Sequence, residues 1–205
     1  MLQTQTITPD TLALLKQLSA QQSLQEMRLV GGTALALQYG HRQSIDLDFF
    51  GRFTVSQEDL IDLARSVGEI SILNKTPHIL QMTINQIKVD FVDYSRYQWI
   101  DEPVQYGTVT LASDKDIAAM KVNAIMGRGT KKDFVDMYVL LQHYSLAEIL
   151  QFYKQKYPEY SEYRALLSLT YFDDAELQPM PRMFITDTWE QMKRTIVRAV
   201  KLYQS

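Results

Sequence analysis

The pattern of apolar residues changes at about residue 112, and this change limits the folds that the chain can adopt. Before it, short segments with the two-residue period of β-strands alternate with helical segments. After it, helix start signals recur at Ser113, Thr130 and Ser145, and the strand pattern does not return. The sequence therefore predicts an α/β (α+β) chain with two subdomains that share a cleft, residues 1–112 and a helical part over residues 113–205.

The first part is predicted to contain both helices and strands. Helices are expected over 8–21, 33–39 and 56–67, and strands over 27–30, 44–50, 70–73, 79–84 and 87–94. Asn85-Gln86 is expected to form a hairpin turn, and Gly68 is expected to end its helix in the left-handed conformation. The last segment, 187–204, predicts an amphipathic helix with a basic edge of Arg194, Arg198 and Lys201.

Composition excludes several classes of protein. The 205 residues contain no cysteine, so that a metal would be held by oxygen or imidazole ligands. The three histidines share no ligand spacing and are expected to be structural or surface residues. No apolar run reaches the roughly 20 residues of a membrane helix and no secretory signal opens the chain, which predicts a cytoplasmic protein without a membrane partner. A net charge of −3 argues against a general nucleic-acid coat but permits a local basic groove.

The sharpest chemical feature is Asp46-Leu47-Asp48, which falls in a predicted strand. Residues i and i+2 of a strand point to the same face, so the two carboxylates would lie together and repel unless a cation sits between them. Oxygen ligands favour Mg²⁺ or Mn²⁺, which bind through carboxylates and substrate phosphates. The alternative is a solvent-exposed strand face that carries two ordinary aspartates.

Two further segments give the aspartate pair a context. Gly31-Gly32-Thr33 lies between a predicted strand and a predicted helix, where backbone N–H groups can hold phosphate oxygens, although a tight turn before a helix would produce the same letters. Asp90 lies on the alternating segment 87–92 and could join the pair from a neighbouring strand, as a metal ligand or as the acceptor of a proton.

These segments resemble the AbiEii/AbiGii toxin family within the DNA polymerase β-like nucleotidyltransferase superfamily. The resemblance is carried by Leu29–Leu37 and Gly40–Phe50, and by the later segments Asp116–Lys121 and Arg128–Tyr138. It covers about residues 27–142 and leaves the last sixty residues unsupported. Thr33 stands where the family usually has serine, which keeps the hydroxyl group.

The resemblance implies a mixed sheet flanked by helices and the transfer of a nucleoside monophosphate from an NTP to a hydroxyl group. The acceptor would be a tRNA 3′ end, and the protein would be the toxin of a type IV toxin–antitoxin or phage-defence system, with an antitoxin encoded nearby. Asp46, Asp48 and Asp90 would hold Mg²⁺, while Gly31, Gly32 and Thr33 would hold the triphosphate of the NTP.

The resemblance also gives expectations for the cationic residues. Lys121 would reach the triphosphate from its helix. Arg42 and Ser44 lie on the approach to the aspartate pair. Ser44 would bind the nucleotide, and Arg42 would contact phosphate or brace an aspartate. Lys132 and Asp133 are candidate site residues at a helix start, a position where an aspartate is also favourable for purely structural reasons.

Two other readings stay open at this level. The acceptor could be the hydroxyl group of a small molecule or protein, which suits the acidic net charge. The chain could also be a non-catalytic member of the fold that serves as a binding or regulatory module. The basic edge Arg194, Arg198 and Lys201 is a candidate RNA contact, and a solvated helix face explains it equally well.

Overall fold

The computed structural model of the protein describes residues 2–205, which form two compact units. The first unit contains the chain up to Gly40, Ser44–Gln98 and Glu102–Ala112. The second contains Ser113–Ser205 and two short segments from the first half of the sequence, His41–Gln43 and Trp99–Asp101.

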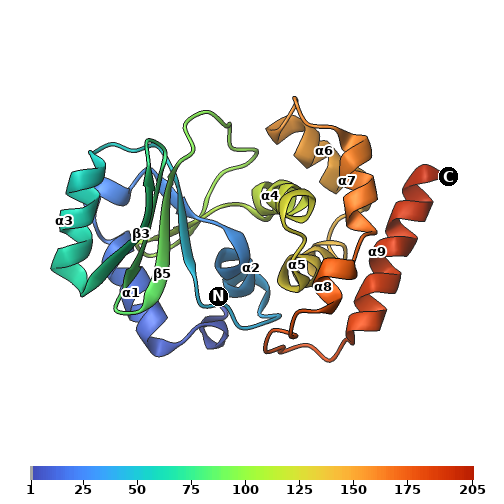
Figure 1. Ribbon diagram of the computed structural model, residues 1–205, viewed down its shortest axis with the longest axis horizontal. Helices are drawn as coiled ribbons and strands as arrows, with labels where there is room; N and C mark the ends of the chain where they lie inside the picture. The colour runs from blue at the N-terminus through green and yellow to red at the C-terminus, as the bar shows by residue number, and fades with distance from the viewer. Residues whose placement is uncertain (1) are drawn as a thin grey trace. The chain divides into compact units, whose positions relative to one another are not determined.

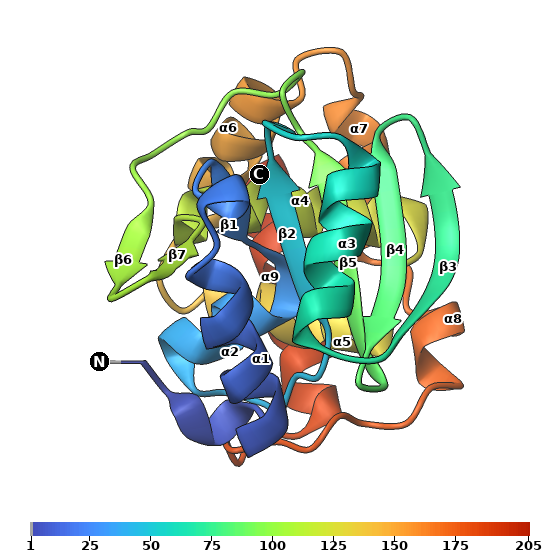
Figure 2. The ribbon, with the colours of Figure 1, turned by 90° about the vertical axis from the view of Figure 1, so that its left-hand side faces the viewer.

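The first unit is built on a mixed β-sheet. Its seven strands have the order β3-β4-β5-β2-β1-β7-β6 across the described residues (Figure 2). Their bounds are β1 Met27–Leu29, β2 Leu47–Gly51, β3 Ile70–Thr76, β4 Ile79–Ile84, β5 Ile87–Asp93, β6 Val104–Tyr106 and β7 Val109–Leu111. The pairs β2/β5 and β1/β7 are parallel, and the other neighbouring pairs are antiparallel. The predicted α/β class is confirmed.

Helices α1 (Pro9–Ser19) and α3 (Gln57–Val67) cover one face of this sheet (Figure 2). Both begin as their sequences predict, because the Thr8 and Ser56 side chains accept a hydrogen bond from the backbone N–H three residues on. Helix α2 (Gly31–Tyr39) ends at Gly40, which adopts the left-handed conformation with φ of +72°. Their apolar residues Leu15, Leu18, Leu35 and Leu60 are buried.

The hairpin between β4 and β5 is confirmed, but the predicted role of Gly68 is wrong. Asn85 and Gln86 both have positive φ, as a two-residue hairpin turn requires. Gly68 is extended, with φ of 179°, so it does not end α3 in the left-handed conformation. A Cβ atom there would lie 2.4 Å from the Asn85 side chain, so the position needs glycine for close packing.

Two strand predictions also need correction. Strand β2 begins at Leu47 and not at residue 44, because Ser44 and Asp46 are bonded to the side chain of Thr33 instead of joining the ladder. The antiparallel pair β6/β7 was not expected, since three residues are too few to show an alternating pattern.

The second unit is helical across its described residues, as predicted. Its helices are α4 Asp114–Gly127, α5 Lys131–Leu140, α6 Leu146–Lys156, α7 Glu162–Leu169, α8 Asp173–Glu176 and α9 Trp189–Gln204. Helix α4 packs against α5, α6 and α7, and α9 packs along the same three helices at the outer side of this unit (Figure 1). Across residues 2–205, no helix is long and apolar enough to cross a membrane.

A buried ion pair explains why Trp99–Asp101 belongs to the helical unit. The Lys156 Nζ atom lies 2.7 Å from Asp116 Oδ1, and both side chains are fully buried. The two Asp116 oxygens also accept hydrogen bonds from the backbone N–H groups of Ile100 and Asp101, at 2.9 and 3.3 Å. The Lys156 ammonium group lies 4.6 Å from the centre of the Trp99 ring. The segment is thus held to α4 and α6 by charge-assisted hydrogen bonds and a cation–π contact.

Candidate active site

Asp48 and Asp90 lie side by side on the two central strands of the first unit. They are direct partners in the parallel ladder between β2 and β5. Partners in a ladder project their side chains to the same face of a sheet, so both carboxylates leave that face together. Asp46 lies two residues before Asp48, just outside β2. The ladder therefore brings together two carboxylates that are 42 positions apart in the sequence.

The Gly31 backbone lies close to the Asp48 carboxylate. Gly31 has φ of +69°, and a Cβ atom at this position would lie 2.7 Å from Asp48 Oδ2. A side chain at Gly31 would therefore both strain the backbone and displace the carboxylate. Val30, at the N-cap of α2, offers no side-chain cap, which leaves the first-turn N–H groups of α2 for other acceptors such as phosphate oxygens.

Asp90 has one satisfied and one unsatisfied oxygen. Its Oδ2 atom accepts hydrogen bonds from Gln81 Nε2 at 2.7 Å and from Lys88 Nζ at 2.9 Å. Its Oδ1 atom is buried and has no hydrogen-bond partner among the described residues. A buried carboxylate oxygen without a partner is costly, and such atoms mark positions where a ligand can bind.

Lys88 supplies the positive charge of this site. Partial burial lowers the pKa of Lys88, but its hydrogen bond to Asp90 and the charges of Asp90, Asp48 and Asp46 outweigh burial, so that the pKa is raised. The three carboxylates predicted from the sequence therefore all act on one ammonium group. Lys88 was not among the residues predicted from the sequence, although it alternates with Asp90 in the same strand pattern.

The carboxylate oxygens of this site decide which metal ion it can bind. No three His, Asp or Glu side chains within residues 2–205 converge closely enough to enclose a metal. Asp48 and Asp90, with a buried oxygen still unpaired, fit Mg²⁺, which usually binds through one or two carboxylates together with substrate phosphates and water. The donor set therefore suits a metal that arrives with a nucleotide.

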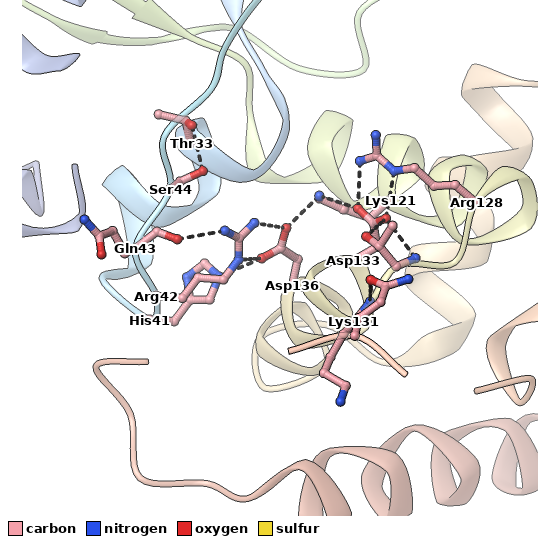
Figure 3. A network of polar contacts seen from close by, with 12 residues as sticks. Thr33, His41, Arg42, Gln43, Ser44, Lys121, Arg128, Lys131, Asp133 and Asp136 are labelled. Atoms are coloured by element: carbon pink, nitrogen blue, oxygen red, sulfur yellow. Dashed lines mark hydrogen bonds and ion pairs between the residues drawn. The ribbon is translucent and has the colours of Figure 1, made fainter. Parts of the chain in front are cut away.

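Thr33 and Ser44 hold the backbone that leads into the aspartate pair. The Thr33 hydroxyl group is hydrogen bonded to the Ser44 hydroxyl group at 2.8 Å (Figure 3). It is also hydrogen bonded to the Asp46 carbonyl oxygen. Both side chains are buried. In this arrangement the two hydroxyl groups position Asp46, and their predicted contact with the nucleotide stays a prediction.

A second group of predicted site residues lies in the helical unit, around Asp136 (Figure 3). Asp136 is fully buried and accepts hydrogen bonds from His41 Nε2 at 2.8 Å and from Arg42 Nε and Nη2 at 2.6 and 2.8 Å. Lys121 Nζ lies 2.6 Å from Asp136 Oδ2, the oxygen that also accepts the hydrogen bond from Arg42 Nη2. Burial raises the pKa of Asp136, but Arg42, Lys121 and the His41 hydrogen bond outweigh it and hold that pKa well below its ordinary value.

Asp133 continues this network. It accepts hydrogen bonds from Lys121 Nζ at 3.0 Å, from Arg128 Nε and Nη2 at 2.9 and 3.0 Å, and from the Thr130 hydroxyl group at 2.5 Å. Burial would raise the pKa of Asp133, yet Lys121, Arg128 and Thr130 lower it far below the ordinary value. Asp133 also completes a capping box with Thr130 at the start of α5.

The structure thus places the predicted cations in different settings. Arg42 braces an aspartate, one of the two alternatives left open, and this aspartate is Asp136. Lys121 is buried between Asp133 and Asp136, whereas Lys132 is exposed on the first turn of α5. His41 is a buried, hydrogen-bonded histidine, as expected.

The chain is similar to known proteins over most of its length. The family model described as nucleotidyl transferase AbiEii toxin, type IV TA system, matches residues 13–204, well beyond the 27–142 expected from the sequence motifs. An uncharacterized protein of Aquifex aeolicus (strain VF5) is 35% identical over 182 residues, which cover 85% of this chain and 86% of that protein.

Solved structures share the fold. A putative nucleotidyltransferase from H. pylori is similar with a TM-score of 0.57 at 19% identity, over 95% of each chain. The antibiotic-resistance factor ANT(2″)-Ia is similar with a TM-score of 0.54 at 12% identity, over 70% of this chain and 89% of that one. The chain therefore belongs to the AbiEii family of nucleotidyl transferase toxins of type IV toxin–antitoxin systems.

Proposed function

We propose that this nucleotidyltransferase is a Mg²⁺-dependent enzyme that transfers a nucleoside monophosphate from an NTP to the 3′-terminal hydroxyl group of a tRNA. It would act in the cytoplasm as the toxin of a toxin–antitoxin pair, and an antitoxin encoded nearby would be its partner. The observation that carries the proposal is the alignment of Asp48 with Asp90 beside the Gly31 turn. Carboxylates next to free helix N–H groups suit a triphosphate that brings its own cation.

The proposed site has a role for each carboxylate. Asp46, Asp48 and Asp90 would hold Mg²⁺, or Mn²⁺ in its place, which when bound polarises the α-phosphate and neutralises the pyrophosphate. The acceptor oxygen forms a bond to the α-phosphorus, the bond to the oxygen that bridges to the β-phosphate breaks, and pyrophosphate leaves. The alternative role for the buried and unpaired Oδ1 atom of Asp90, in place of metal binding, is to accept the hydroxyl proton.

The remaining predicted residues would bind the nucleotide. The first-turn N–H groups at Gly31 and Gly32 would hold phosphate oxygens, with the Gly31 backbone already against Asp48. Lys88 is hydrogen bonded to Asp90. When a metal cation binds beside the carboxylates, the Lys88 ammonium group would instead contact the phosphates of the nucleotide. Nucleotide contacts of Arg42, Lys121 and Lys132, and a catalytic role of Asp133, remain predictions. Arg42, Lys121 and Asp133 belong to the buried Asp136 network.

A small-molecule acceptor is the second candidate. The net charge of −3 favours it slightly, because an acidic protein repels RNA over most of its surface. An enzyme of this kind would bind the same NTP at the same carboxylates, so only the acceptor separates the two proposals.

The test incubates the purified protein with Mg²⁺, total tRNA and each of the four NTPs separately, with a label at the α-phosphate. We expect label on tRNA from one preferred NTP and none after the metal is chelated. Mg²⁺-dependent NTP binding without labelled tRNA would reject the RNA acceptor and favour the small-molecule acceptor. Absence of Mg²⁺-dependent NTP binding would contradict both.

A further inference from the structure

Helix α9 borders a groove on the helical unit that the proposed chemistry does not use. The groove has a volume of about 560 Å³ and is lined by Phe172, Lys193, Arg194, Val197, Arg198 and Lys201. Figure 1 shows α9 along the outer side of the helical unit. Its residues Met192, Ile196 and Val200 are buried. The cations therefore project from the side of the helix that does not pack.

The charge of α9 is opposite to that of the whole chain. With four cations and one glutamate, the helix contributes +3 to a protein whose net charge is −3. Lys193 is neutralised by Glu176 and Glu190. Arg194, Arg198 and Lys201 are exposed and line the groove. Within residues 2–205, none of the three forms an ion pair or hydrogen bond with another residue, and this includes the exposed Asp173 and Asp174. A groove with three available cations favours a polyanion.

The spacing of these cations suits a repeating anion. Positions i, i+4 and i+7 lie on one face of a helix, about one turn of 5.4 Å apart. A single phosphate would occupy one of the three, whereas the phosphates along a nucleic-acid strand can occupy all of them in succession.

The groove also contains an aromatic surface. Phe172 is held between Phe134, with 4.8 Å between ring centroids, and Trp189, at 5.8 Å and 88°. The ring is half-buried, so one part of it stays open to the groove. A basic groove that contains a fixed aromatic ring is typical of proteins that bind single-stranded nucleic acid, because the cations contact the backbone while a base stacks on the ring.

We propose that the groove beside α9 binds a single-stranded segment of the acceptor RNA, with its phosphates on Arg194, Arg198 and Lys201 and one base against Phe172. The proposal rests on the proposed function, because an RNA acceptor is what this surface would hold. It adds a binding site that contains none of the residues proposed for the chemistry.

The experiment measures binding of a fluorescein-labelled, unstructured RNA of about 12 nucleotides by anisotropy, without NTP, over a series of salt concentrations. The variant Arg194→Ala/Arg198→Ala/Lys201→Ala should bind at least about tenfold more weakly, and its salt slope should be smaller by about 2, since each phosphate contact in single-stranded nucleic acid contributes about 0.7. Phe172→Leu should weaken binding about tenfold and leave the salt slope unchanged. The control Lys16→Ala/Lys154→Ala/Arg164→Ala removes three exposed cations from α1, α6 and α7, and should bind as the unaltered protein does.

The outcomes separate this proposal from the proposed function. If the groove variant binds RNA like the unaltered protein, or if the control variant loses as much affinity, the groove proposal is overturned even where tRNA is labelled. If no NTP labels tRNA but only the groove variant loses RNA binding, the groove binds RNA as proposed, whereas the proposal that RNA is the acceptor is overturned. Tight binding of an acidic protein without binding of RNA would also overturn the groove proposal.

Discussion

Asp48→Asn is expected to lower the rate of nucleotidyl transfer at least about a thousandfold while the fold stays intact. The amide keeps the size of the side chain beside Gly31 but removes a charge from the aligned pair Asp48 and Asp90. Loss of a metal-binding carboxylate removes several kcal/mol of transition-state stabilisation, and a thousandfold corresponds to about 4 kcal/mol. Initial rates of label incorporation, with circular dichroism to verify folding, measure the effect.

The matched control for this variant is Asp62→Asn. Asp62 is exposed on α3 and forms a surface ion pair with Arg65, so its substitution should change neither the rate nor the fold. A folded Asp48→Asn protein that keeps more than a tenth of the original rate would show that Asp48 does not take part in the chemistry.

Asp136→Asn is expected to destabilise the helical unit by about 3–5 kcal/mol. The fully buried carboxylate accepts hydrogen bonds from Arg42 and pairs with Lys121, and both cations are themselves buried. Removal of one partner of a buried ion pair leaves uncompensated charge in the protein interior, which is strongly destabilising. Urea unfolding followed by tryptophan fluorescence measures the stability of the helical unit, because both tryptophans of the chain, Trp99 and Trp189, belong to it.

The pH dependence of this effect has a definite sign. The folded protein holds the pKa of Asp136 below its ordinary value of about 3.9, so the carboxylate stabilises the fold above that pH, and the stabilisation is lost as the pH falls through the folded-state pKa. The difference in the free energy of unfolding between Asp136→Asn and the unaltered protein should therefore be largest at pH 7 and become smaller below about pH 4. Glu58→Gln, which breaks the exposed pair with Lys75, should change stability by less than about 1 kcal/mol at either pH. A comparably small change for Asp136→Asn at pH 7 would contradict this interpretation of the network.

Local features of the fold could be predicted from the sequence because neighbouring residues determine them. The capping boxes of Ser56 with Asp59 and of Ser145 with Glu148 begin helices where predicted. Gly68 could not be understood in this way, since its close neighbour Asn85 is 17 positions away. The position of β2 between β1 and β5 likewise depends on pairing between distant segments.

The same distinction applies to the candidate site. Asp46, Asp48 and Asp90 could be proposed from strand periodicity, but their common action on Lys88 depends on the β2/β5 register. The role of Asp136 could not be predicted, because its partners His41 and Arg42 are 95 and 94 positions earlier in the chain. The predicted helix start gave a structural reason for an aspartate at position 133, and only the folded chain shows that Lys121 and Arg128 both donate hydrogen bonds to Asp133.

The position of the transferred phosphorus in the NTP distinguishes nucleotidyl transfer from other reactions of a triphosphate. The preferred NTP, labelled at the α-phosphorus in one sample and at the γ-phosphorus in another, is incubated with the protein, Mg²⁺ and tRNA. We expect the α-label on the 3′ end of tRNA in equal amount to the pyrophosphate released, and the γ-label only in pyrophosphate. A γ-label on the RNA would instead show phosphoryl transfer, and absence of both labels from the RNA would contradict an RNA acceptor.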